Sequence, residues 1–187
     1  TEVKLDPFCQ ELFAGIDRDA VDLIPNYDNT TTEPTLLPTT FPNILVSPNI
    51  GIAVGMTCKI CSFNLAEICD GTIALLKNPR LSLDKMMELV KAPDFPGGGL
   101  LVYDPEAIRT VYETGVGPIR VRARYRYDAS ENSIDILQIP YSTTIEDIMD
   151  KLTELIKNNK LKEIADVRDA IDINGFKLTL DLRRGTD

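Results

Sequence analysis

The chain has 187 residues, 43% of them hydrophobic, and its 29 acidic and 20 basic side chains give a formal net charge of −9 at pH 7. This length can bury one good core, or one domain and part of another. The net negative charge argues against a protein that coats nucleic acid without sequence preference, because nonspecific affinity for nucleic acid depends on many Lys and Arg side chains. No apolar run is long enough to span a bilayer and no signal-peptide pattern opens the sequence, so we expect a cytoplasmic protein without membrane contact.

The first elements are predicted from hydrophobic spacing and from turn-forming residues. Apolar side chains from Leu5 to Ile16 recur at helical spacing, with Pro7 in the first turn, and predict an amphipathic helix. The polar segment 25–38 is rich in Thr, Asn and Pro and predicts an irregular linker. We therefore place a domain boundary in it, with residues 1–34 closing one domain and residues 35–187 forming the next.

The stretch from Pro38 to Asn64 carries two short apolar runs, Ile44–Val46 and Ile50–Val54. Glycines at positions 51 and 55 interrupt the second part of the stretch. Glycine at such places indicates close backbone approach or an unusual φ. Short apolar runs are mostly core, so the residues alone favour a buried loop–strand–loop.

Two of the four cysteines, Cys58 and Cys61, form a Cys-x-x-Cys pair, which can supply half of a zinc site. The sequence has no histidine and no second pair at matching spacing, so zinc would require Cys9 and Cys69, or a carboxylate, to converge on the first pair. Buried thiols acting as small hydrophobes are the favoured interpretation, and we expect no metal ligand in the chain.

Caps and stop signals predict four further helices. They begin after Asn64, after Ser82, at Pro105 and after Thr144. A glycine turn at 96–99 leads into a predicted strand at 100–103.

The clearest strand spans residues 119–127, where apolar side chains alternate with Arg120, Arg122, Arg124 and Arg126. A period of two places all four guanidinium groups on one face, in a row of about 20 Å. Such a row can meet several phosphates of a nucleic acid, or it can be a solvated face paired with nearby acids such as Glu131 and Asp135. The residues leave both interpretations open.

Antiparallel pairing is predicted for the rest of the second half. The strand at 119–127 turns at 128–132 into a partner strand at 134–139, and segments 164–170 and 177–182 predict another pair. Helices mixed with antiparallel strands, without a regular βαβ repeat, indicate an α+β fold.

Several short motifs occur in a fixed order along the chain. The most specific are Gly51–Met56 (Gly-Ile-Ala-Val-Gly-Met) and Pro93–Pro96 (Pro-Asp-Phe-Pro). Others are Asn26–Asp28, Phe41–Asn43, Tyr112–Gly115, Arg122–Arg124 and Ile139–Tyr141. Together they resemble the breakage–reunion subunit of bacterial type IIA topoisomerases, which is the A subunit of DNA gyrase and of topoisomerase IV. The resemblance covers nearly the whole chain.

The resemblance implies that residues 1–34 are the C-terminal end of a winged-helix DNA-gate domain. Residues 35–187 would then be an α+β tower domain with antiparallel strands, truncated before a coiled coil. In the family, an Arg-Tyr-Thr-Glu motif carries the tyrosine that attacks a DNA phosphodiester. The chain begins Thr1-Glu2, so we expect this nucleophile to lie before it, with no catalytic residue inside it and no DNA cleavage by the chain alone.

The resemblance assigns DNA bending to the Gly51–Met56 motif. Ile52 matches the isoleucine that wedges between base pairs, and an apolar wedge unstacks bases without requiring a hydrogen bond in return. Gly51 frames the wedge, and Ile50 lies on the same face of an extended segment as a candidate substitute. Lys59 is a weaker candidate for DNA contact. Among the arginines, Arg122 and Arg124 match family positions, and Arg120 and Arg126 extend their row.

The resemblance also implies the partners. The whole protein would be an ATP-dependent type II DNA topoisomerase that breaks, passes and rejoins double-stranded DNA. It would work with a B-type subunit and with a second copy of the A subunit, and Mg²⁺ and ATP are expected on the B-type subunit rather than on this chain. The alternative is a non-catalytic structural or protein-interaction module of a divergent homologue. If that module held metal at Cys58 and Cys61, stoichiometric zinc and sensitivity to a chelator would reveal it.

Overall fold

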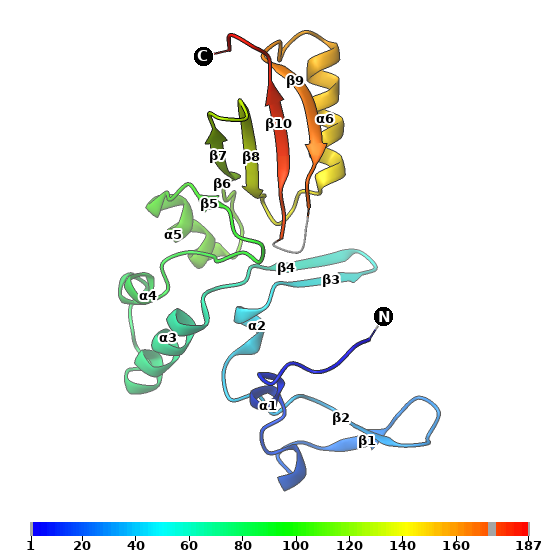
Figure 1. Cartoon of the computed structure of the whole chain (residues 1–187). Coiled ribbons are helices and arrows are strands. Elements are labelled where there is room, and N and C mark those ends of the chain that lie inside the picture. The colour runs from blue at the N-terminus through cyan, green and yellow to red at the C-terminus, as the bar shows by residue number, and fades with distance from the viewer. Residues whose placement is uncertain (1, 172–174, 187) are drawn as a thin grey trace. The chain divides into compact units, whose positions relative to one another are not determined.

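The computed structural model describes residues 2–171 and 175–186, and the chain divides into two compact units, residues 1–91 and residues 92–187. Each unit combines helices with small antiparallel sheets, which agrees with the predicted α+β class (Figure 1). The winged-helix and tower assignments, with a boundary at residue 34, stay predictions.

The first unit consists of short helices and two hairpins. Its helices are α1 (Cys9–Leu12), the 3-10 turn η1 (Ile16–Arg18), α2 (Asn43–Val46), α3 (Leu65–Lys77) and α4 (Leu83–Leu89). Its hairpins are β1 (Leu23–Pro25) with β2 (Thr32–Pro34), and β3 (Asn49–Ala53) with β4 (Met56–Ile60).

The two longer helices of this unit, α3 and α4, begin where the sequence predicts. The Asn64 side chain accepts hydrogen bonds from the first backbone N–H groups of α3, and Ser82 caps α4 in the same way. Gly71 allows the helices to approach, because a Cβ at this position would lie 3.0 Å from side-chain atoms of Met86 and Val90. Buried Ile68 and Val90 complete this small core.

Two predictions for the first unit are wrong. The single helix expected from Leu5 to Ile16 is replaced by the short helix α1 and the separate 3-10 turn η1, and Gly15 between them takes a left-handed φ of 89°, which a continuous helix does not allow. The linker expected at 25–38 contains the turn and the second strand of the β1–β2 hairpin. Side-chain oxygens of Asn26 and Asp28 accept hydrogen bonds from the Thr30 N–H and close its turn. Polar residues that suggest a linker therefore build a turn between two short strands.

The second unit is built on a four-stranded antiparallel sheet in the order β7-β8-β10-β9, and a separate ribbon pairs β5 with β6. Its elements are β5 (Leu100–Leu101), α5 (Pro105–Thr114), β6 (Val121–Arg122), β7 (Arg124–Asp128), β8 (Ser133–Gln138), α6 (Ile145–Lys157), β9 (Ile164–Asp169) and β10 (Leu178–Leu182). Helix α6 connects β8 to β9 and runs alongside β9 (Figure 1). The sequence correctly predicts α5, α6 and strands β8, β9 and β10.

Register sorts the side chains of this sheet onto two faces. Leu178 and Leu180 of β10 are buried and pair with Ile136 and Ile134 of β8. Thr179 of β10 pairs with Asp135 and lies on the opposite, polar face, because successive side chains alternate across a strand. The apolar face supplies the core, and the polar face carries Asp135 and, opposite it on β7, Arg126.

The single strand predicted at 119–127 is instead two strands. β6 pairs with β5, β7 pairs with β8, and Ala123 lies between them. The ladder is also irregular between Arg124 and Tyr125, where a bulge re-aims side chains. The four arginines therefore do not form one straight row on one sheet. The neighbouring strand expected at 100–103 is shorter too, and ends at Leu101.

Candidate nucleic-acid interface

The β3–β4 hairpin presents apolar side chains to solvent. Ala53 pairs with Met56, so Val54 and Gly55 form a two-residue turn in which Gly55 takes a φ of 79°. Glycine adopts this left-handed conformation without a Cβ penalty. Ile52 lies just before the turn and is 83% exposed. The interpretation of this run as a buried loop–strand–loop is therefore wrong.

Strand register distributes the predicted residues of this hairpin over its two faces. Ile50 and Ile52 share one face, and Lys59, the cross-strand partner of Ile50, brings an exposed ammonium group to it. Gly51 belongs to the other face, where a Cβ would lie 3.7 Å from the Cβ of its partner Cys58. One face of the hairpin thus carries Ile50 and Ile52, the two apolar candidates for DNA contact, together with the cation Lys59.

Two exposed apolar residues of the hairpin are not among the predicted site residues. Val54 in the turn and Met56 on β4 are 106% and 75% exposed, respectively. Their exposure follows from the tight turn, and the pair of glycines is the sequence signal that could have indicated it.

The arginines differ in what their guanidinium groups contact. Nη2 of Arg126 lies 3.0 Å from Oδ2 of Asp135, the residue directly opposite on β8. Asp135 is only 2% exposed, its Oδ1 accepts a hydrogen bond of 2.8 Å from Oγ1 of Thr179, and Nζ of Lys177 lies 3.1 Å from its Oδ2. For Arg126, the interpretation as one member of an ion-paired sheet face is therefore confirmed.

The pKa of Asp135 reflects this environment. Burial disfavours its charged form, but hydrogen bonds from Thr179, Arg126 and Lys177 outweigh the burial, and the pKa of this carboxyl group is lowered. A carboxylate that stays ionised holds the Arg126 charge close to the sheet. Arg126 is thus less able than Arg120, Arg122 and Arg124 to neutralise a phosphate.

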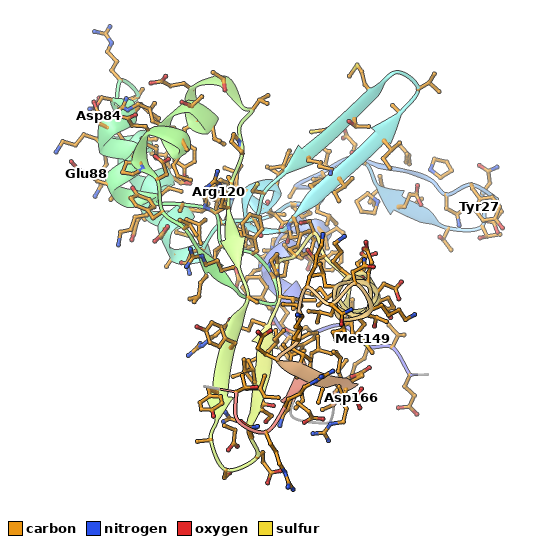
Figure 2. The ribbon with its side chains drawn as sticks, turned by 90° about the horizontal axis from the view of Figure 1, so that it is seen from above. Tyr27, Asp84, Glu88, Arg120, Met149 and Asp166 are labelled. Carbon is orange, nitrogen blue, oxygen red and sulfur yellow. The ribbon has the colours of Figure 1, made fainter. Side chains whose placement is uncertain are left out.

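Arg120, Arg122 and Arg124 are exposed and have no ion-pair partner within residues 2–171 and 175–186. Arg120, which is labelled in Figure 2, directly precedes β6 in the second unit. These three side chains retain the positive charge that phosphate binding requires. The hairpin residues lie in the first unit and the arginines lie in the second.

The expectation that the cysteines are buried thiols is wrong for Cys58, which is exposed on β4. Cys61 lies half-buried beyond the end of this strand, and both are free thiols. Burial raises the pKa of the Cys61 thiol, which disfavours the thiolate that zinc needs. In the described part of the chain, no three His, Cys, Asp or Glu side chains gather into a group that could hold a metal ion. Likewise, no helix among these residues is long and apolar enough to cross a membrane.

Comparison with known proteins identifies relatives along the whole sequence. The family model for the A subunit of DNA gyrase/topoisomerase IV matches residues 1–187. The chain is 38% identical over 189 residues to the DNA gyrase A subunit of Chlamydia pneumoniae, an alignment that covers 99% of this chain and 22% of that protein. It is 39% identical over 187 residues to the DNA gyrase A subunit of Granulibacter bethesdensis, covering 98% of this chain and 20% of that protein.

A third relative, the DNA gyrase A subunit of Pseudomonas aeruginosa, is 38% identical over 190 residues. The chain spans about a fifth of the length of these relatives. Because the family model matches every residue and the identity extends over almost the entire chain, the chain belongs to the family of DNA gyrase/topoisomerase IV A subunits.

Proposed function

We propose that the chain is the DNA-bending part of the A subunit of an ATP-dependent type II DNA topoisomerase, with Ile52 as the wedge. The observation that carries the proposal is the 83% exposure of Ile52 next to the tight turn of the β3–β4 hairpin. A branched apolar side chain that is exposed to solvent next to a turn has the shape and chemistry to insert between two adjacent base pairs. Ile50, 55% exposed on the same face, is the candidate substitute.

Bending DNA requires cations that contact phosphates as well as an apolar wedge, because the bend itself costs free energy. Bending a site of 20–30 base pairs costs on the order of 1–6 kcal/mol, which contacts to phosphates must offset. Lys59 lies on the same hairpin face as Ile52, and Arg120, Arg122 and Arg124 have no ion-pair partner in the described chain. We assign the phosphate contacts to these four cations. Arg126 has a lesser role because Asp135 holds it.

The whole protein would act on double-stranded DNA together with a B-type subunit and with a second copy of the A subunit. We propose that the B-type subunit binds ATP and Mg²⁺, and that the catalytic tyrosine belongs to the A subunit outside this sequence. The tyrosines of the chain then have no role in strand cleavage. The chain alone is expected to bind and bend duplex DNA without cutting it.

Bending can be measured by energy transfer between dyes at the two ends of a short duplex. We expect the chain to bring the ends closer, and Ile52→Ala to abolish most of this change while weakening duplex binding about tenfold, or about 1.4 kcal/mol. Met56→Ala is the matched control, because Met56 is an exposed apolar residue on the opposite face of the same hairpin. It should bend DNA as the unmodified chain does.

Two results would contradict the proposal. One is equal loss of bending in Ile52→Ala and Met56→Ala, which would indicate a general role of hairpin hydrophobicity. The other is the absence of salt-dependent duplex binding by the chain, which would favour the structural or protein-interaction module.

A further inference from the structure

A groove of about 560 Å³ lies in the second unit, beside β6. The β5–β6 ribbon forms one side, with Arg120 and Arg122, and the segment between β8 and α6 forms the other, with Tyr141, Ser142 and Thr143. Sites for small molecules have volumes of about 300–1,000 Å³, so the groove falls in this class. It is too small to seat a double helix.

The charge of the groove is positive although the chain is acidic. Arg120 and Arg122 line it without an ion-pair partner in the described chain, and no Asp or Glu is among the described residues of its lining. Two cations in a concave, partly apolar site concentrate positive potential there. Guanidinium groups bind carboxylate and phosphate oxygens through paired N–H donors. The groove therefore favours an anion.

The other residues that line the groove favour a ligand with an aromatic body and a polar edge, in addition to its negative charge. The rings of Phe95 and Tyr141 border the groove together with aliphatic side chains. Tyr141 also lines an adjoining hollow of about 220 Å³, so this residue borders both cavities, and it is 46% exposed. Such rings can pack against a flat aromatic body. Side-chain hydroxyls of Ser142 and Thr143 make no hydrogen bond within the described residues and can serve the polar edge of a ligand.

We infer that this groove binds a small aromatic anion, of the class that includes nucleoside monophosphates and aromatic carboxylates. Arg120 and Arg122 hold the anionic group, and Phe95 and Tyr141 pack against the aromatic body. The site goes beyond the proposed DNA bending: it shares Arg120 and Arg122 with the proposed phosphate contacts, but Phe95 and Tyr141 have no part in those contacts. A nucleoside phosphate could come from solution or from the end of a nucleic-acid strand, and the two sources share the chemistry that the groove recognises.

Fluorescence titration with anilinonaphthalene sulfonate, an aromatic anion, tests the site on the whole chain. We expect saturable binding that weakens about tenfold in Arg120→Ala and in Arg122→Ala, as loss of a charge-assisted contact predicts. Arg124→Ala is the matched control, since Arg124 is exposed on the next strand but does not line the groove. Its affinity for the probe should be unchanged.

Competition and amide chemical shifts complete the experiment. Adenosine monophosphate should displace the probe, whereas inorganic phosphate at the same concentration should not, and probe binding should shift the amide resonances of 119–122 and 140–143. Tyr141→Phe should bind as well as the unmodified chain, and Tyr141→Ala more weakly. Displacement by a short single strand with a terminal phosphate at a lower concentration than the free nucleotide requires would identify the strand end as the source and still support the site.

Three outcomes would overturn the inference: equal weakening in Arg124→Ala, equal competition by inorganic phosphate, or amide shifts confined to the β3–β4 hairpin. The last would show that the probe binds exposed apolar residues instead. Failure of the groove is distinguishable from failure of DNA bending, because Ile52→Ala should leave probe binding unchanged and Tyr141→Ala should leave the duplex bent.

Discussion

At the scale of single residues, the ion pair with the buried carboxylate of Asp135 distinguishes Arg126 from Arg120, Arg122 and Arg124. Asp135 accepts a hydrogen bond from Thr179, which is 4% exposed, and pairs with Arg126 and Lys177. We expect Asp135→Ala to lower the free energy of unfolding by about 2 kcal/mol, because the Thr179 hydroxyl loses its acceptor and two cations lose their shared partner. Urea unfolding followed by circular dichroism measures this, with Glu163→Ala, an exposed acid of the same unit, as the control. Equal effects of the two changes would contradict the prediction.

The same carboxylate predicts a pH dependence of stability. The pKa of Asp135 is lower in the folded chain than in the unfolded chain, so the unfolded state binds the proton more readily. Its contribution is fully present above the unfolded pKa of about 3.9 and is lost as the pH falls through the lower folded pKa. The stability difference between the unmodified chain and Asp135→Asn should therefore be constant between about pH 5 and pH 7 and shrink below about pH 4. Urea unfolding across this range tests it, and a difference that grows as the pH falls would reverse the sign.

At the scale of an element, the tight turn of the β3–β4 hairpin depends on Gly55. Its φ of 79° disfavours a residue with a Cβ, although no atom lies within 4 Å of that Cβ position. We expect Gly55→Ala to cost about 1–2 kcal/mol through backbone strain alone and to raise amide hydrogen exchange in β3 and β4. Gly51→Ala is the matched control, since its Cβ would make an ordinary 3.7 Å contact and its φ is not left-handed. Equal exchange in the two variants would show that the turn tolerates a side chain.

The elements that the sequence predicts correctly are those with local signals. Helix α6 combines a Thr144 cap with apolar residues at helical spacing, and both signals lie within the helix itself. The segment 119–127 is predicted as one strand because apolar and arginine side chains alternate along it without a break. The change of pairing partner at Ala123 depends instead on β5 and β8, which are separate elements. Ile52 is open to two interpretations for a similar reason. Its residue type gives no information on whether another element covers it, and only the motif favours exposure.

At the scale of the whole molecule, net charge and local charge act in opposite directions on DNA. A formal charge of −9 opposes association with a polyanion. Exposed charges more than a Debye length apart, about 10 Å at 0.1 M salt, are largely screened. Duplex binding by this chain must therefore come from cations that touch phosphates and that no carboxylate already neutralises. Ion pairing within the fold then determines which arginines contribute to duplex binding.

Single arginines should therefore differ in how their removal changes the salt dependence of duplex binding. Each neutralised phosphate contributes about 0.9 to the magnitude of the slope of log affinity against log salt concentration. Arg124→Ala should reduce that magnitude by about 0.9, because Arg124 has no ion-pair partner among the described residues. Arg126→Ala should leave it nearly unchanged, because Asp135 holds the Arg126 guanidinium group at 3.0 Å. Fluorescence anisotropy of a labelled duplex over a series of salt concentrations measures both slopes. A larger reduction in Arg126→Ala than in Arg124→Ala would mean that DNA displaces Asp135 from Arg126, and that the ion pair of the free chain does not select the contacts.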